Sequence, residues 1–405
     1  MDFRMTEEQE LLLDGLRELM ERECSEDYIK QCDAEGRPPV EFYKALVDNG
    51  YGLLGCPESV GGTPVDNLTL MLVKEEICRL GGPIHALTSM FHVDMMKEFG
   101  TEEQLEKCMA EINEGRMPFC SGFSEPQAGS DSHAILTSYV RREDGKIEIN
   151  GHKTFISMAG LCPYMACLAR DFTREGEYFT MFFVPMDAPG VKTAPLHKIG
   201  WNMNPTYEVY LENVVVEEKD IKGKEGEAFK QLMRNFEMER LMMAVAILGM
   251  AECAYEDAAK YANQRVQFGK PIGTRQLIQE KIVNMKIKIM NMKNLCYQCA
   301  WEKDQGISIR NASALCKLYC AQAGNEVIDD ALQIMGGIGY TQDCRISRLW
   351  RAARNYRIGG GTDEIDWDNM NKPQNGGSDN SGSNTGNSGN SGSSNSGSSN
   401  PGRNA

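Results

Sequence analysis

The chain has 405 residues, 41% of them hydrophobic, and carries a net charge of -15 at neutral pH. This length allows two or three domains with more than one core, and the acidic balance without a basic stripe argues against a protein that binds nucleic acid. The 14 cysteines are scattered, no secretory signal pattern opens the chain, and no apolar run approaches 18 residues. We therefore expect free thiols, a cytoplasmic location and no membrane span.

Residues 1–117 are predicted to form a helical domain. Thr6–Gln9 and Thr101–Gln104 are both capping boxes, in which side chains satisfy the first free N–H groups of a helix. The first box should start a helix from about Thr6 to Glu23, because leucines then recur on one face. The run Leu68–Leu80 predicts another helix, which ends at two glycines and a proline.

Residues 118–222 are predicted to form a small antiparallel β-domain, because short β-rich runs recur between turns. The predicted strands are Thr137–Val140, Ile147–Ile149, Thr154–Ile156, Tyr164–Ala169, Phe179–Val184 and Tyr207–Val216.

The helical period returns in residues 223–370, where long helices with short connections predict a four-helix bundle. The expected helices are Glu227–Arg265, Thr274–Lys303, Ser308–Met335 and Ser347–Asn355. Residues 371–405 consist almost entirely of Asn, Ser and Gly and are predicted to be a disordered tail, because they have no apolar surface to bury. The fold class is therefore α+β.

The longest predicted helix contains Glu239 and Arg240 within a mostly apolar stretch. An acid and an arginine in a buried helix are costly unless each has a partner or a ligand, so the pair is a site candidate. A structural ion pair is the commoner explanation of such a pattern. Glu237 should point elsewhere, since it lies about 200° round the helix.

Two motifs in the β-domain offer hydroxyls and rings. Phe123–Asp131 is a polar, turn-rich loop that contains Ser124 and Ser130. In the following strand Phe155 and Ser157 share one face, because side chains alternate across a strand. Taken singly, the first is typical of a plain loop and the second of a sheet core.

Two motifs of the C-terminal region suit a phosphate-bearing ligand. Arg265–Ile272 ends a helix with a donor-rich turn that carries a guanidinium and an aromatic ring, although capping a helix C-terminus is the commoner role of such an arginine. Gln333–Thr341 is glycine-rich and would let backbone N–H groups approach a pyrophosphate. It is not a dinucleotide-binding fingerprint, because it does not follow a strand.

The cysteine pairs Cys296/Cys299 and Cys316/Cys320 have helical spacing. In a bundle interior such cysteines act as small hydrophobic residues, and the histidines form no ligand pattern, so we expect no metal.

Together and in this order, the motifs resemble the flavin-dependent acyl-CoA dehydrogenase family over residues 1 to about 365. The match rests on S-E-P-x-A-G-S-D, K-T-F-I-S, R-V-Q-F-G-K-P-I, Q-I-M-G-G-x-G-Y-T and G-G-T-D-E-I. The resemblance implies a helical N-terminal domain, a middle β-domain and a C-terminal four-helix bundle. It also implies FAD as the cofactor, an acyl-CoA thioester as substrate, electron-transferring flavoprotein as partner and a homo-oligomer, usually a tetramer.

The resemblance also assigns roles to particular residues. Phe123, Ser124, Phe155 and Ser157 would line the flavin ring; Arg265, Phe268, Gln276, Gln333, Gly336 and Gly337 would hold the FAD of a neighbouring subunit; Thr362 and Glu364 would touch the chain's own FAD. Ser130 would lie near the CoA moiety, and Arg240 would face the CoA phosphates or brace the base. The loop and helix around His85 to His92 would shape the acyl pocket.

The position of the catalytic base departs from the commonest pattern of the family. Most members carry a glutamate immediately before G-T-x-x-I, where this chain has Gly360. A smaller branch, which includes isovaleryl-CoA dehydrogenase, places it on the long helix before an arginine, which matches Glu239–Arg240. We therefore expect Glu239 to be the acid/base and the backbone N–H of Gly360 to bind the thioester oxygen.

Within the family the chain looks closest to the crotonobetainyl-CoA reductase branch, which implies a short-chain acyl-CoA or enoyl-CoA reaction. Two alternatives stay open: an acyl-CoA oxidase, distinguished by fast peroxide formation, and a non-catalytic structural member, suggested by Gly360 and by the loss of the usual last helix beyond residue 366.

Overall fold

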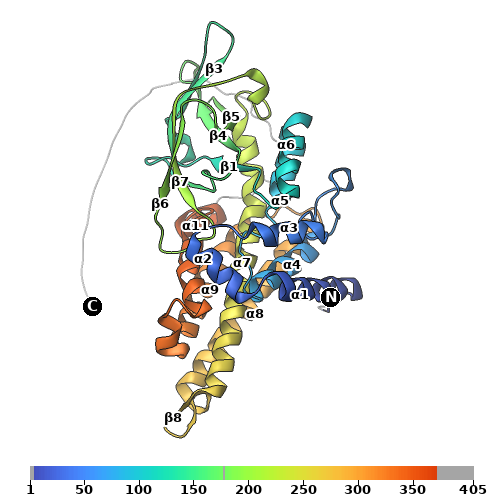
Figure 1. Ribbon diagram of the computed structural model, residues 1–405, viewed down its shortest axis with the longest axis vertical. Helices are drawn as coiled ribbons and strands as arrows, with labels where there is room; N and C mark the ends of the chain where they lie inside the picture. The colour runs from blue at the N-terminus through green and yellow to red at the C-terminus, as the bar shows by residue number, and fades with distance from the viewer. Residues whose placement is uncertain (1–3, 177, 372–405) are drawn as a thin grey trace, which may run out of the picture. The chain divides into compact units, whose positions relative to one another are not determined.

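The computed structural model describes residues 4–176 and 178–371, which form one compact unit (Figure 1). The predicted Asn/Ser/Gly tail lies outside these residues. No helix among those that the structure describes is both long and apolar enough to cross a membrane.

Six helices precede the sheet, and their ends follow the capping signals. Thr6 and Gln9 form the predicted box before α1, and Thr101 and Gln104 form the second before α6. The helices are α1 Glu7–Glu23, α2 Glu26–Glu35, α3 Val40–Asp48, α4 Asn67–Arg79, α5 Ser89–Phe99 and α6 Glu102–Asn113.

The middle region is a seven-stranded sheet in the order β1-β4-β2-β3-β7-β6, with β5 also paired to β4. Its strands are β1 Phe119–Gly122, β2 Ser138–Arg141, β3 Ile147–Ser157, β4 Tyr164–Arg170, β5 Phe179–Pro185, β6 Val191–Leu196 and β7 Thr206–Val216. Most pairs are antiparallel, as predicted, but β4 pairs in parallel with β1 and, through one residue pair, with β2. Two of the predicted strands are parts of β3, which is irregular near Gly151 and again before Ile156.

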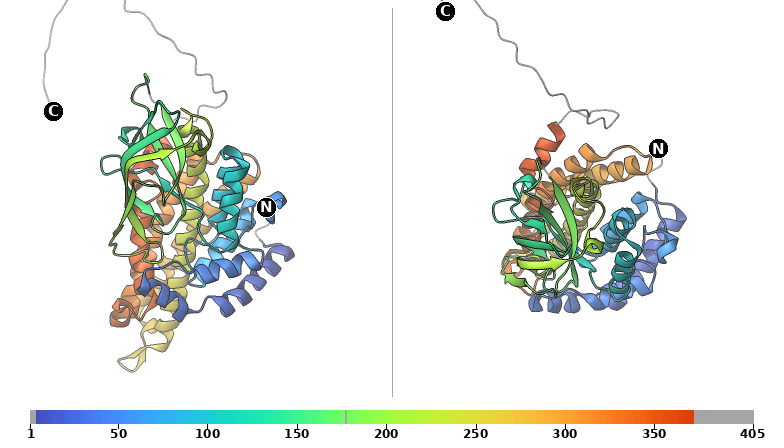
Figure 2. Two further views of the ribbon diagram at one scale, coloured as in Figure 1. Left: turned by 45° about the horizontal axis from the view of Figure 1, so that its top comes forward. Right: turned by 90° about the horizontal axis from the view of Figure 1, so that it is seen from above.

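The C-terminal region consists of long helices, as predicted. They are α7 Ala228–Gln264, α8 Gln276–Asp304, α9 Arg310–Met335 and α10 Arg345–Ala353, and the two-residue strands β8 Val266–Gln267 and β9 Lys270–Pro271 join the first two. A further helix, α11 Asp363–Asn371, follows the glycine turn. Figures 1 and 2 show the sheet at one end of these helices and the β8–β9 turn at the other.

Helix α4 joins the N-terminal helices to the bundle, because it packs against both α7 and α8. One hydrophobic cluster accordingly runs from Leu13 in α1 to Tyr356 after α10. Of two smaller clusters, one lies within the β-domain, and the other joins the sheet to Met96 of α5, Cys108 of α6 and Ala228 of α7.

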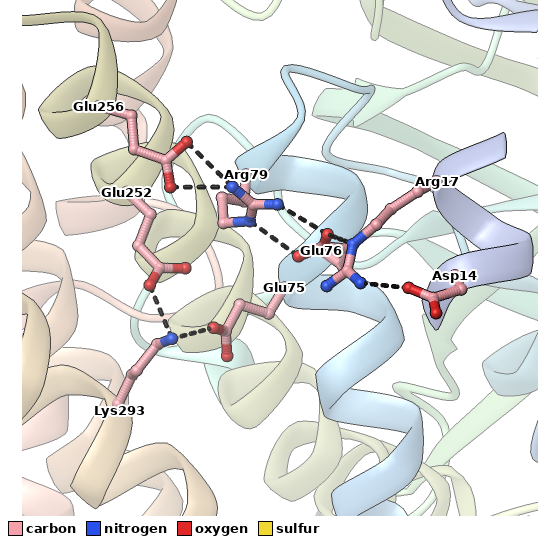
Figure 3. Close-up of polar contacts among 8 residues, drawn as sticks. All are labelled: Asp14, Arg17, Glu75, Glu76, Arg79, Glu252, Glu256 and Lys293. Carbon is pink, nitrogen blue, oxygen red and sulfur yellow. Dashed lines mark hydrogen bonds and ion pairs between the residues drawn. The ribbon is translucent and has the colours of Figure 1, made fainter. Parts of the chain in front are cut away.

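Because α4 is buried over most of its length, its charged residues require partners. Figure 3 shows how they are paired: the Lys293 ammonium of α8 lies 2.9 Å from Glu75 and 2.7 Å from Glu252 of α7. Burial and the neighbouring Glu75 carboxylate raise the pKa of Glu252 to about 8, although Lys293 opposes the rise. A neighbouring set joins Arg79 to Glu76 and to Glu256.

Candidate active site

Glu239 and Gly360 lie together, although 121 positions of sequence separate them. A Cβ built on Gly360 would lie 3.9 Å from the Glu239 Oε1 atom and only 2.3 Å from the Met243 sulfur. Glu239 is a half-buried residue, whereas Glu237 points towards Lys303, 3.9 Å away. Burial raises the pKa of Glu239, and Arg240 and Lys317 oppose that rise. A carboxylate with raised basicity therefore faces the glycine turn.

Behind Glu239, an ion cluster joins three helices. The Arg240 guanidinium of α7 lies 3.3 Å from Asp366 of α11, and the Lys317 ammonium of α9 lies 3.1 Å from the other oxygen of the same carboxylate. Lys317 also donates a hydrogen bond to the Gly361 carbonyl. Arg240 is only 8% exposed, so this geometry favours a bracing role for it over contact with CoA phosphates. Sequence reasoning missed Lys317 and Asp366, because nothing local shows that they meet.

The β-domain presents an aromatic ring to solvent beside the polar loop. Phe155 is 70% exposed and has a φ of 59°, a conformation that bulky residues rarely adopt. The irregularity in β3 before Ile156 places it there. Ser124 belongs to the same place, since its carbonyl accepts a hydrogen bond from the Thr154 amide at 3.0 Å. Phe123, Ser124, Phe155 and Ser157 thus come from two neighbouring segments, as expected.

A buried ion pair holds these two segments together. Lys153 lies 2.8 Å from Glu125, and the Glu125 carboxylate also accepts hydrogen bonds from the amides of Leu136 and Thr137. Burial raises the pKa of Glu125, but Lys153 and these hydrogen bonds outweigh it and bring the pKa to about 2. The polar loop therefore has a fixed backbone. Sequence reasoning overlooked the pair, although both residues belong to the quoted motifs.

The predicted phosphate-binding motifs lie away from the sheet. The β8–β9 turn carries Phe268, which is 94% exposed, and Arg275 lies against its ring. This turn is at the far end of α7 from the sheet, so one chain does not bring Arg265 or Phe268 to Phe155 (Figure 1). Gly336 and Gly337 follow α9, and a Cβ built on either would meet nothing within 4 Å.

The remaining predicted residues lie at exposed or half-buried positions. Gln276, Gln333, Ser130 and Glu364 are exposed, and Thr362, before α11, is half-buried. The Thr362 hydroxyl accepts a hydrogen bond from the Ile365 amide at 3.4 Å, which caps α11.

A cavity of about 330 Å³ lies where α3, the segment before α5 and the β-domain meet. His85, Leu87 and His92 line it, together with Tyr43 and Met158. Neither Glu239 nor Gly360 lies on its wall.

The cysteines of α8 and α9 are buried free thiols. The sulfur atoms of Cys296 and Cys320 are 3.7 Å apart, and the Cys316 thiol donates to the Leu295 carbonyl. They fill the α8–α9 interface. Among the residues described, no group of three or more His, Cys, Asp or Glu side chains is arranged to hold a metal ion.

Comparison with known proteins agrees with this architecture. Three family models match: the acyl-CoA dehydrogenase N-terminal domain over residues 6–116, the middle domain over 120–214 and the C-terminal domain over 226–373. The probable acyl-CoA dehydrogenase YdiO of Escherichia coli K12 is 51% identical over 368 residues, which cover 90% of this chain and 96% of YdiO. The chain belongs to the acyl-CoA dehydrogenase family.

Solved structures of the family share the fold. The butyryl-CoA dehydrogenase of Megasphaera elsdenii has a TM-score of 0.82 at 29% identity, covering 91% of this chain and 98% of that one. A chain from the structure of the electron-transferring flavoprotein of Acidaminococcus fermentans has a TM-score of 0.83 at 30% identity, with the same coverage. As an acyl-CoA dehydrogenase, the protein is a flavin-dependent oxidoreductase.

The residues present fit a flavin. A flat ring system needs an apolar face with polar atoms beside it, and Phe155 offers an exposed aromatic face next to Ser124 and Ser157. The positive φ of Phe155 is a strained backbone conformation. Phe155 is 70% exposed, so little packing within the chain offsets this strain. A flat ligand stacked on the Phe155 ring would offset the strain.

Proposed function

We propose that this chain catalyses the α,β-dehydrogenation of a short-chain acyl-CoA thioester, or the reverse reduction of the enoyl-CoA, with FAD as its flavin. The observation that carries the proposal is the Glu239 carboxylate facing the Gly360 turn. In most of the family, by the resemblance described above, the base stands at the position of Gly360. Here the carboxylate reaches the same place from α7.

The residues divide the chemistry as follows. A thioester α-proton is weakly acidic, so its removal needs a positioned base of raised basicity, and Glu239 supplies it. The backbone N–H of Gly360 donates to the thioester oxygen, on which negative charge develops as the proton leaves. A bound FAD would supply the acceptor for the hydride from Cβ, so that the substrate would lose one proton and one hydride. Arg240 braces Glu239 from behind through Asp366.

We further propose that the FAD site is completed by a second copy of the chain. Phe123, Ser124, Phe155 and Ser157 would line the ring, and Thr362 and Glu364 would lie near it. Arg265, Phe268, Gln276, Gln333, Gly336 and Gly337 would come from the neighbouring subunit. Their distance from the sheet within one chain and the near-complete exposure of Phe268 support a shared site.

The outer face of α8 supports an oligomer, with a homotetramer as the expected form. Val283, Ile287 and Met290 are each more than half exposed and recur at helical spacing, and Leu277 is 74% exposed. Exposed apolar stripes of this kind mark protein–protein contacts.

For the substrate we propose crotonobetainyl-CoA or γ-butyrobetainyl-CoA, which would place the protein in carnitine metabolism; another short-chain acyl-CoA would place it in fatty acid β-oxidation. The support is the Glu239–Arg240 pair combined with the G-G-T-D-E-I ending. Ser130, exposed at the end of the polar loop, would contact the CoA moiety. For the electron partner we propose electron-transferring flavoprotein, and the likeness to a chain of the Acidaminococcus structure supports it. A cytoplasmic location fits the free thiols.

An anaerobic titration tests the reaction. Purified protein is mixed with saturated acyl-CoAs and γ-butyrobetainyl-CoA while the visible absorbance of oxidised flavin is followed. Bleaching by one thioester supports the proposal and identifies the acyl group. Bound flavin that no thioester bleaches would contradict it, and fast peroxide formation after reduction would identify an oxidase.

A non-catalytic structural role is the second candidate, because the usual glutamate is absent at Gly360. Purified protein that is colourless and does not take up added FAD would favour that role.

A further inference from the structure

We propose that Asp366 is a positioning residue that sets the basicity of Glu239 by neutralising the two cations beside it. The proposal rests on the proposed function of Glu239 as the base. Asp366 is fully buried and bridges Arg240 and Lys317, which come from different helices. No other negative charge within the described residues forms an ion pair with either cation.

Arg240 and Lys317 both act on Glu239, and Asp366 pairs with both of these cations; Asp363 of α11 also acts on Asp366, but it is itself paired with Arg357 at 2.7 Å. Arg240 follows Glu239 on α7, and Lys317 of α9 is near enough for its charge to lower the pKa of Glu239, as Arg240 also does. Asp366, from α11, adds the second negative charge. Burial raises the pKa of Asp366, and the two cations, Lys317 at 3.1 Å and Arg240 at 3.3 Å, oppose that rise. Without that charge, Arg240 and Lys317 would stabilise ionised Glu239 and make it a weaker base.

The same cluster fixes the turn opposite the base. Lys317 donates to the Gly361 carbonyl, and Gly360 and Gly361 both have positive φ values, at 64° and 99°. Asp366 pairs with the same Lys317 ammonium at 3.1 Å. A single carboxylate therefore braces both the base and the turn that would bind the thioester oxygen.

The test replaces Asp366 with an amide of the same shape. Asp366→Asn should lower the titration midpoint of Glu239 by about one pH unit or more, because an uncompensated cation within a few ångströms has an effect of that size. Infrared difference spectra against Glu239→Gln report this midpoint without substrate, and the pH profile of kcat/KM reports it in turnover. The double variant D366N/K317Q should return the midpoint towards that of the unmodified protein, because it removes one of the two cations.

Asp257→Asn is the matched control. Asp257 lies on α7, as Glu239 does, but at a distance from it along the helix. Its carboxylate forms a bidentate ion pair with Arg345. The Asp257→Asn variant should have a changed melting temperature, but the pH at which Glu239 is half-titrated should stay the same. Where Asp366→Asn does not fold, Lys317→Gln alone should raise the midpoint.

The outcomes separate the two proposals. An unchanged midpoint in both Asp366→Asn and Lys317→Gln overturns the role of Asp366, even if the enzyme turns over. A shifted midpoint in a protein that oxidises no thioester would instead support the charge relation and contradict the proposed function.

Discussion

At the scale of single residues, the proposed base Glu239 and the glycine turn near it depend on each other. Glu239 of α7 lies near the Gly360 turn, and a side chain at position 360 would force the Met243 thioether to move. A glutamate at 360 would compete with Met243 and lie next to Glu239. The absence of a side chain at 360 and the presence of an acid at 239 are therefore two parts of one arrangement.

We expect Glu239→Gln to retain FAD and to lose turnover by a factor of at least roughly 100, because proton transfer by a positioned base contributes about that much. Flavin absorbance measures the retention, and anaerobic reduction by the best thioester measures the loss. Glu237→Gln is the control, since Glu237 points to Lys303. Full activity of the Glu239 variant would disprove its role.

Gly360→Ala should destabilise the fold for two reasons that can be separated. Its φ of 64° costs an alanine about 1 kcal/mol, and the new Cβ would meet the Met243 sulfur. Gly145→Ala is the matched control, because its φ is 81° and nothing lies within 4 Å of the added Cβ. Urea unfolding should show the larger loss at 360, and the double variant M243A/G360A should reduce the difference. Equal losses at both positions would show that the Met243 contact is unimportant.

At the scale of secondary-structure elements, buried charges determine how α4 joins the bundle. The acid pair Glu75 and Glu252 meets one ammonium, Lys293, so two negative charges share one positive charge (Figure 3). This arrangement favours a protonated Glu252 in the folded state.

The stability of the protein should therefore fall as the pH rises. The pKa of Glu252 is about 8 in the folded protein and near 4.5 when unfolded, so the folded state binds the extra proton between these values. Its contribution is fully present below about pH 4.5 and is lost as the pH approaches 8, by roughly 3–5 kcal/mol. Glu252→Gln should flatten the pH dependence of the free energy of unfolding in this window. Glu256→Gln, on the same helix but half exposed, should not. Parallel curves for Glu252→Gln and the unmodified protein would exclude this role.

The elements themselves were largely predictable, because helix caps and hydrophobic periods are local. Thr6, Thr101 and the glycines after residue 80 mark helix ends that the structure confirms. The strands β1 and β6 were missed: the first has four residues, and the second is a half-exposed edge strand containing Pro195. The parallel pairing of β1 with β4 could not be predicted, since sequence patterns do not encode which strands become neighbours.

Residues of the candidate site could be predicted only where they belong to a recognisable sequence pattern. Glu239 was proposed from its place in a mostly apolar helix and from the family resemblance, and Phe155 from a motif, whereas the partner of Arg240 was not predicted, because Asp366 is distant in sequence and part of no motif. Long-range ion pairs depend on the final packing of α7, α9 and α11.

At the scale of the whole molecule, we expect the exposed apolar face of α8 to be a contact between subunits. Ile287→Glu should weaken self-association by at least roughly tenfold, because it would place an unpaired charge in an apolar contact. Sedimentation velocity would show smaller species, and FAD should be lost with them if the site is shared. Ile199→Glu, at a 73% exposed position outside α8, is the control. Unchanged assembly of the Ile287 variant would exclude this face as the interface.

The shared core of the two helical regions also affects how the chain is made. Helix α4 ends at Arg79, and its partner helices α7 and α8 are complete only at Asp304, about 225 residues later. At a ribosomal rate of roughly 5–20 residues per second, synthesis of this stretch takes roughly 10–45 seconds. For that time the apolar sides of α4 are not covered by α7 and α8. During translation the nascent N-terminal third therefore exposes a hydrophobic helix surface to which chaperones and other chains can bind. Slowing the ribosome between residues 80 and 304 should increase chaperone binding and aggregation, although it alters no amino acid.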